Sequence, residues 1–138
     1  DWHEGEYLGL LERLLEQTER DCLIHADLHE QNVILDKDVW RVIDPHGWNT
    51  TPEADIWVIL CDDIVGLSDE GYIEEFKERM ICYCSAADMD MSLACEWIML
   101  RSSISLSRIV ANSSPPEADL IWKIYLEKIV EASEILIS

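Results

Sequence analysis

The sequence predicts a mostly helical α+β fold in which a short β-rich region interrupts a series of helices. Apolar residues recur at helical spacing near the amino terminus and through most of the second half of the chain. Between these segments, two β-rich runs flank a short turn, and a loop containing proline and glycine follows. The 138 residues are 49% hydrophobic and 28% charged, which is ordinary for a globular protein. We therefore predict a single domain over residues 1–138 with a real core.

The first part of the chain is predicted to form a helix, three short strands and a loop. Leu8, Leu11 and Leu15 place an apolar stripe on the helix. The turn over 36–38 lies between two runs of β-branched and aromatic residues, which favours a hairpin. In order, the predicted elements are a helix over 4–20, a strand over 22–24, strands over 33–35 and 39–43, and a loop over 45–52.

The rest of the chain is predicted to be helical. The run IWVIL, within 53–65, fits a strand or a buried helix, and we predict a helix. Ser68 is expected to cap the next helix, and Ser114-Pro115-Pro116-Glu117 has the form of a capping box with proline in the first turn. Trp97, Met99 and Leu100 are expected to be core residues. The later helices are expected from 69 to about 84, from about 90 to 111, and from the capping box to about 137.

The charge balance excludes some classes of partner. The chain has 10 basic and 29 acidic residues and a net charge of −19. Such a field repels nucleic acid and anionic lipid, so we expect neither a nucleic-acid binder nor a membrane-surface protein. The charge suits a cationic substrate or a basic partner. A soluble acidic surface without any specific partner explains it equally well.

The cysteines and the lack of targeting signals favour a cytoplasmic protein. The five cysteines are an odd number and none has CxxC spacing, so a zinc site or a disulfide framework is not expected. Cys22 and Cys61 lie in apolar runs, where a free thiol behaves as a small hydrophobe. Cys82 and Cys84 fall on different faces of a helix. We find no signal peptide and no apolar run that could span a bilayer.

The stretch HADLHEQN, at 25–32, and the later run VIDPHGW contain the candidate chemistry. If the two strands pair around their turn, Asn32 lies beside Asp44, although twelve positions separate them. An amide oxygen and a carboxylate at the mouth of a hairpin form an oxygen-only site that suits Mg²⁺. Asp27, in the same loop, could orient a hydroxyl and accept its proton during attack on a phosphoryl group.

These residues also allow simpler interpretations than phosphoryl transfer. Asp and Asn also end strands and form turns, but the spacing here meets several independent requirements of phosphoryl transfer, which we favour. His25 is expected to brace the backbone near Asp44 rather than transfer protons. His29 could contact phosphate or be a solvated loop residue. His46 is interpreted as a loop residue, and His3 is assigned no role.

The motif resembles a known family. "LIHADLHEQNVIL…VIDPHGW" is similar to the catalytic loop of the aminoglycoside and small-molecule phosphotransferases, which has the pattern HxDxxxxN. Protein kinases usually have Lys two residues after the base, where this chain has His29, and it has IDP rather than DFG. The resemblance implies the carboxy-terminal lobe of a protein-kinase-like fold. It further implies ATP and Mg²⁺ as cofactors, with Asp27 as base and Asn32 and Asp44 as metal ligands.

The resemblance continues downstream and is good over residues 8–60. Pro52-Glu53-Ala54-Asp55 is similar to the GDPxxD segment of the family, whose last Asp supports the catalytic loop through backbone amides. Asp55 would inherit this structural role. Thr51 stands where the family has the first Asp, so no role tied to that Asp is carried over. The helical tail, with Trp57, Cys61 and Trp97, most resembles the streptomycin and hydroxyurea phosphotransferase subgroup.

A small cationic molecule with a hydroxyl group, such as a streptomycin-like aminoglycoside, is the expected substrate. Glu53, Asp62 and Asp63 could line an acidic pocket for its amines, although a solvated helix face is the favoured interpretation of these three residues. The sequence does not choose among individual substrates.

The amino-terminal nucleotide lobe of such kinases is missing from the sequence. There are five glycines, none in a GxGxxG arrangement, and no GxxxxGK[ST] motif. No Lys follows a plausible strand ahead of the loop. We therefore expect a carboxy-terminal lobe that needs a nucleotide lobe in cis or in trans and has little turnover alone. The alternative is an inactive remnant, or an acidic helical domain that binds a partner and retains the loop for structural reasons.

Overall fold

The computed structural model describes residues 4–16, 22–64 and 70–138, without the side chains of 4–7 and 61–64. It is a mostly helical α+β structure, as predicted. The elements are α1 (Glu4–Glu16), β1 (Cys22–Ile24), the 3₁₀ helix η1 (Glu30–Asn32), β2 (Val33–Asp36), β3 (Val39–Val42), β4 (Trp48–Thr50), the 3₁₀ helix η2 (Pro52–Asp55), α2 (Ile56–Ile64), α3 (Tyr72–Ala87), α4 (Met91–Ala111) and α5 (Glu117–Ile137).

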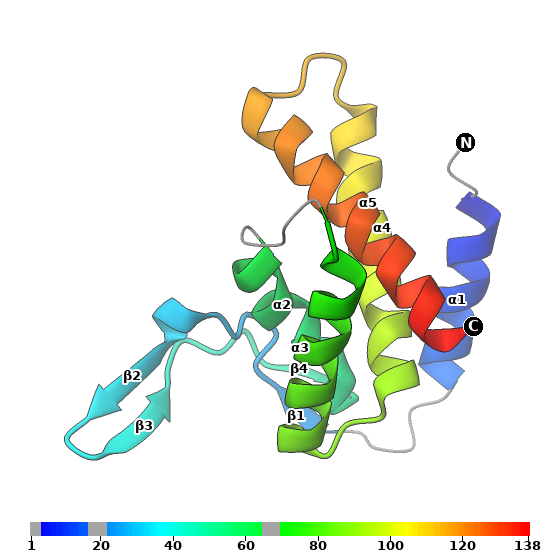
Figure 1. Cartoon of the computed structure of the whole chain (residues 1–138). Helices are drawn as coiled ribbons and strands as arrows, with labels where there is room; N and C mark the ends of the chain where they lie inside the picture. Colours follow the sequence, from blue (N-terminus) through cyan, green and yellow to red (C-terminus); the bar gives the residue numbers. More distant parts are fainter. Residues whose placement is uncertain (1–3, 17–21, 65–69) are drawn as a thin grey trace.

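The helices form the body of the molecule. Helices α4 and α5 lie side by side, α3 packs against both, and α1 lies along α4 (Figure 1). Leu10 and Leu14 of α1 are buried against Leu100 of α4. Burial of such a leucine contributes about 1.5–3 kcal/mol. The largest apolar side chains of the main core are all nearly inaccessible; they are Ile56, Leu60, Phe76, Met80, Ile98, Leu106, Leu126 and Ile129.

The strands form two separate two-stranded antiparallel sheets. In the first, β1 pairs with β4, and Leu23 lies opposite Asn49. In the second, β2 and β3 form the predicted hairpin, in which Val33 lies opposite Val42 and Asp36 opposite Val39. The hairpin projects from the helical body (Figure 1), and every residue of β3 is exposed. The base of the hairpin, where β2 begins and β3 ends, lies next to the 25–32 loop.

Several local predictions are confirmed by the structure. The run IWVIL forms α2, and the helices predicted over 90–111 and up to 137 are α4 and α5. Leu100 is buried, while Trp97 and Met99 are partly buried against it, so these residues do belong to a core. Cys84 is buried and Cys82 is exposed, in agreement with different helix faces. Apart from these predictions, none of the helices within the described ranges is long and apolar enough to cross a membrane.

The loop predicted over 45–52 is wrong in part, because it contains β4. Three residues are too few for an alternating pattern to be recognised. Their pairing partner lies more than twenty positions earlier in the sequence. A strand formed by such a distant partner has no local signal.

Two predicted helix starts are also corrected. Helix α3 begins at Tyr72 after Gly71, whose φ of +82° favours glycine, while Ser68 lies outside the described residues. Helix α5 begins at Glu117 with Pro116 at its N-cap and without a side-chain capping bond. The capping box is absent because prolines disfavour helical geometry in the residues before them. The backbone nitrogen of Ser114 instead donates to Asn112 Oδ1 at 3.0 Å.

Candidate functional site

Asp55, at the end of η2, holds the loop over 25–32 through two hydrogen bonds. The backbone nitrogens of His25 and Ala26 donate to Asp55 Oδ2 and Oδ1 at 2.9 and 2.6 Å. Asp55 is 8% exposed, and both of its carboxylate oxygens are used. These are the backbone-amide contacts that the resemblance implies for this residue. They hold Ala26 at a φ of +68°, a left-handed conformation that costs an alanine about 1 kcal/mol.

His25 joins the loop to the segment that follows β3. Its Nε2 lies 2.8 Å from the carbonyl oxygen of Ile43, and its Nδ1 lies 3.3 Å from the backbone nitrogen of Asp27. A carbonyl only accepts and an amide only donates, so in these contacts Nε2 is the donor and Nδ1 the acceptor. The carbonyl of His25 also accepts from the amides of His46 and Gly47 at 2.9 and 3.3 Å. Both ring nitrogens contact the backbone, so the His25 side chain connects the 25–32 loop to the segment after β3.

Asn32 connects Asp27 to the mouth of the hairpin. Its Nδ2 donates to the backbone oxygen of Asp27 at 2.9 Å and lies 3.4 Å from Asp27 Oδ2. The backbone oxygen of Asn32 accepts from the amide of Ile43 at 3.0 Å. Asp44 follows directly, with a φ of +58°. The hairpin thus brings residue 32 alongside residues 43 and 44, and it orients the Asn32 amide nitrogen towards Asp27.

The carboxylate of Asp27 lies between two imidazoles. Its Oδ2 is 3.5 Å from His29 Nε2 and 3.9 Å from His46 Nε2. The side chain of Asp27 is 36% exposed, so a small molecule can reach it. The sequence interpretation assigned His46 only to a loop and missed this proximity. The available signal was the position of His46 in the sequence, two residues after Asp44. The segment that follows the hairpin returns to the 25–32 loop, where the His46 amide donates to the carbonyl of His25.

Two residues near the base of the hairpin, Asn32 and Asp44, have side-chain oxygen atoms that the described part of the fold does not use. Because the Nδ2 of Asn32 is used within the loop, its Oδ1 is the atom available to a ligand, and no described residue donates to it. Among the described residues the carboxylate of Asp44 likewise has no hydrogen bond or ion pair. One carboxylate with a neutral oxygen is typical of Mg²⁺, which keeps waters and substrate phosphates as its other ligands. Groups of three or more His, Cys, Asp or Glu side chains with metal-site geometry do not occur in the described ranges.

Glu53 does not occupy the place that the sequence suggested. It is 1% exposed, and its Oε1 accepts from the backbone nitrogen of Asp90 at 3.1 Å. Its Oε2 has no partner among the described residues. The solvated helix face is therefore wrong for Glu53, as is an open substrate pocket, because η2 packs beneath α4. The side chains of Asp62 and Asp63 lie outside what the structure describes.

A small cavity of about 280 Å³ adjoins the loop. It lies between the base of the hairpin and helices α2 and α3, and His29 is one of its walls. The other lining residues are Leu28, Glu30, Val33, Val42, Ile59 and Tyr83. Mostly apolar walls with a few polar groups are typical of small-molecule pockets. No local pattern of residues predicts this cavity, because its walls come from four separate segments.

The buried thiols are not candidate nucleophiles. Burial raises the pKa of Cys95 to about 12, with smaller contributions from Cys84, Asp90 and Glu96. Burial, followed by the charges of Glu53 and Asp90, also raises the pKa of Cys84. At neutral pH both groups are therefore thiols, whereas the reactive form is the thiolate.

Comparison with known proteins identifies the family. The model of the phosphotransferase enzyme family matches residues 2–81, which is more than half of the chain. Neither the curated proteins nor the solved structures gave a match. The matched segment contains the loop over 25–32, the hairpin, Asp55 and most of α3. The protein is thus a member of the phosphotransferase enzyme family.

Proposed function

We propose that the chain is the catalytic-loop lobe of an ATP- and Mg²⁺-dependent phosphotransferase that acts on a hydroxyl group of a small cationic molecule. The observation that carries this proposal is the position of Asn32. Its side chain bonds to Asp27, and its backbone bonds to the residue before Asp44. These bonds support the proposal that a base and two oxygen donors share the mouth of one hairpin, which is the set of groups that phosphoryl transfer to an alcohol requires.

Asp27 is the proposed base. Its carboxylate is accessible, and the hydrogen bond from Asn32 Nδ2 to its backbone oxygen fixes the loop around it. A hydroxyl that donates to Asp27 would be oriented for attack, and its proton would pass to the carboxylate as the new bond forms. His25 and Asp55 position this residue through the loop backbone and do not themselves touch the reacting atoms.

Asn32 Oδ1 and the Asp44 carboxylate are the proposed metal ligands. Bound there, Mg²⁺ would neutralise negative charge on the nucleotide phosphates. The described part of the site supplies no comparable positive charge. The cationic side chains between 22 and 64 are Lys37 and Arg41; Lys37 lies in the turn at the far end of the hairpin, and Arg41 pairs with Asp36 at 2.7 Å.

This shortage of cations supports the proposal that a separate nucleotide lobe, in cis or in trans, completes the site. A triphosphate carries several negative charges, and the chain has a net charge of −19. Without additional cations, the nucleotide would bind poorly. The isolated chain is therefore proposed to have little or no turnover.

The acidic surface also supports a cationic substrate. Its long-range field would raise the local concentration of a polyamine-like molecule near the loop. Streptomycin-like aminoglycosides are the first candidates because of the resemblance around Trp57 and Trp97. Part of such a substrate would occupy the cavity beside His29, whose Nε2 lies 3.5 Å from the carboxylate of the proposed base.

The test uses the protein encoded by the whole reading frame, whose sequence upstream of residue 1 is inspected for a glycine-rich strand pair and a Lys. Phosphoryl transfer from ATP to streptomycin and to a panel of amino alcohols is then measured with Mg²⁺. Asp27→Asn should lower kcat by at least about 100-fold, since general bases contribute roughly 10²–10⁴. Nucleotide affinity should change little.

Asp38→Asn is the matched control, because it removes the same charge from the exposed turn of the hairpin. It should keep the wild-type rate. A wild-type rate in Asp27→Asn would show that the base is wrongly assigned. Full activity of residues 1–138 alone would overturn the need for a second lobe, and complete inactivity of the whole protein on every acceptor would favour the inactive remnant.

A further inference from the structure

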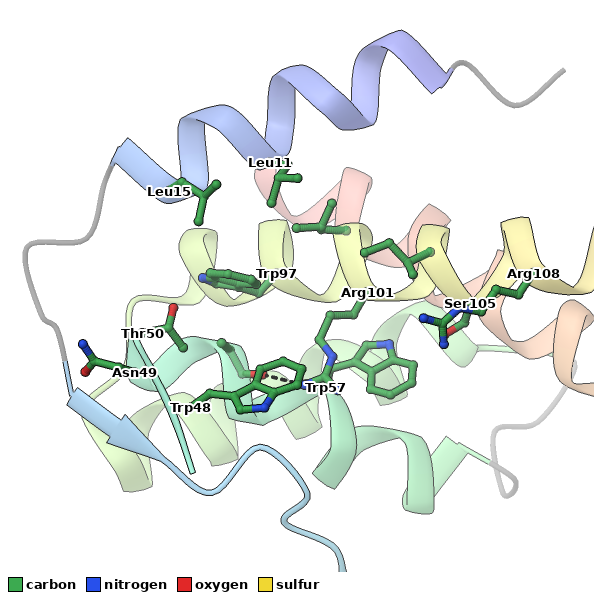
Figure 2. A pocket seen from close by; sticks show the side chains of 13 residues that line it. Leu11, Leu15, Trp48, Asn49, Thr50, Trp57, Trp97, Arg101, Ser105 and Arg108 are labelled. Atoms are coloured by element: carbon green, nitrogen blue, oxygen red, sulfur yellow. Dashed lines mark hydrogen bonds between the residues drawn. The ribbon is translucent and has the colours of Figure 1, made fainter. Parts of the chain in front are cut away.

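A second, larger cavity lies away from the catalytic loop, between α1, β4, α2 and α4. Its volume is about 550 Å³, and none of its lining residues comes from the segment 25–46. Figure 2 shows the walls: Leu11 and Leu15 of α1 on one side, Trp97 on α4, and Trp48 and Trp57 facing them. Mostly apolar and aromatic walls, with a volume between about 300 and 1,000 Å³, are typical of sites for small organic molecules.

The charge of this cavity is opposite to that of the protein. The chain has 29 acidic and 10 basic residues, yet the charged side chains that line the cavity are Arg101 and Arg108. The two arginines are seven residues apart on α4 and therefore lie on the same face, about 10 Å apart along the axis. Asp and Glu are absent from its described lining. The exposed guanidinium of Arg108 beside apolar walls attracts an anion and repels a cation.

Arg101 is built into the wall of the cavity. Its guanidinium lies 4.7 Å from the ring centre of Trp57 and 5.4 Å from that of Trp48. Its Nη1 donates to the backbone oxygen of Ala54 at 3.3 Å. Trp57 is itself fixed, since its Nε1 donates to Ser102 Oγ at 2.9 Å. The aromatic wall is therefore ordered before a ligand arrives, which lowers the entropic cost of binding.

One charged group of the cavity is not used by the fold. Arg108 is exposed in the last turn of α4 and makes no ion pair or hydrogen bond with the described residues. Its guanidinium is therefore available to pair with an anion at the edge of the cavity.

We propose that this cavity binds a small aromatic carboxylate, as a site distinct from the phosphotransfer site. The aromatic ring would lie against the tryptophans, and the carboxylate would pair with Arg108. The ligand would thus have the opposite charge to the proposed phosphoryl acceptor, and the two sites would not compete for one molecule.

The test compares 1-naphthoate with 1-naphthamide, which has the same rings without the charge, by isothermal titration calorimetry on the 138-residue chain. Naphthoate should bind at least ten-fold more tightly, which corresponds to about 1.4 kcal/mol. Arg108→Gln should reduce this preference to less than three-fold, and Arg108→Lys should keep most of it. Arg41→Gln removes the same charge from the exposed hairpin and should leave the preference unchanged.

The position of the site is tested by NMR of the indole N–H groups, assigned with Trp→Phe variants. Naphthoate should shift the signals of Trp48, Trp57 and Trp97 and leave that of Trp40, which is 69% exposed on the hairpin. Equal affinity for the two compounds, a preference that survives in Arg108→Gln, shifts centred on Trp40, or no saturable binding would each overturn the proposal.

Discussion

Replacement of Asp55 by Asn tests how the loop over 25–32 is held. The change is isosteric, but an amide oxygen accepts only one of the two backbone hydrogen bonds, and its NH₂ group faces the other donor. A hydrogen bond to a charged group contributes about 1.5–3 kcal/mol. With one bond lost and the other weakened by removal of the charge, Asp55→Asn should lower the free energy of unfolding by about 2–4 kcal/mol.

Asp90→Asn is the matched control for this experiment. Asp90 Oδ1 accepts from the backbone nitrogen of Leu93 at 2.9 Å at the exposed start of α4. Asn and Asp cap helices about equally well, so the control should change stability by less than about 0.5 kcal/mol. Both variants change the net charge by the same amount, which removes the effect of general repulsion.

The assay is guanidinium unfolding followed by tryptophan fluorescence, with hydrogen exchange of the His25 and Ala26 amides as a local readout. Asp55→Asn should accelerate exchange at these two amides more than elsewhere in the chain. A loss of stability no larger than that of Asp90→Asn, with unchanged exchange at both amides, would show that Asp55 does not hold the loop.

Two further predictions concern stability. The pKa of Cys95 is raised by burial, so the unfolded chain loses this proton first as pH rises, and stability should fall from about pH 9 towards the folded pKa of about 12. Cys95→Ala should remove about 1.4 kcal/mol per pH unit from the slope between pH 9 and 10.5 in denaturant titrations, and an unchanged slope would contradict this assignment. Lys37, in the exposed turn of the hairpin, has a φ of +60°, so Lys37→Gly should raise the free energy of unfolding by about 0.5–1 kcal/mol, and a lower melting temperature would contradict this.

Features with a local signal could be predicted from the sequence. The hairpin was predictable because β-branched runs flank a short polar turn, and the leucine spacing of α1 and the apolar run of α2 were equally informative. The contact between Asp55 and the loop could also be anticipated, but only through the resemblance. Nothing in the composition of residues 52–55 indicates which backbone amides donate hydrogen bonds to Asp55.

Features that depend on distant segments could not be predicted. Strand β4 exists because it pairs with β1, and Glu53 is buried because α4 covers η2. His46 reaches Asp27 because the chain turns back at a residue with positive φ, Asp44. The larger cavity has walls from α1, β4, α2 and α4, and its charge is opposite to the charge of the whole chain. The net charge of the chain therefore does not predict the charge of this cavity.

The most direct test of the account is the location of a divalent cation on the chain. In a ¹H–¹⁵N spectrum, Mn²⁺ replaces Mg²⁺ at oxygen ligands and broadens the signals of nearby amides. We predict that substoichiometric Mn²⁺ broadens the amides of Asn32 and Asp44 first, and that Asp44→Asn abolishes this effect while Asp38→Asn does not. Broadening spread over the acidic helices, with residues 32 and 44 unaffected, would contradict the proposed metal site.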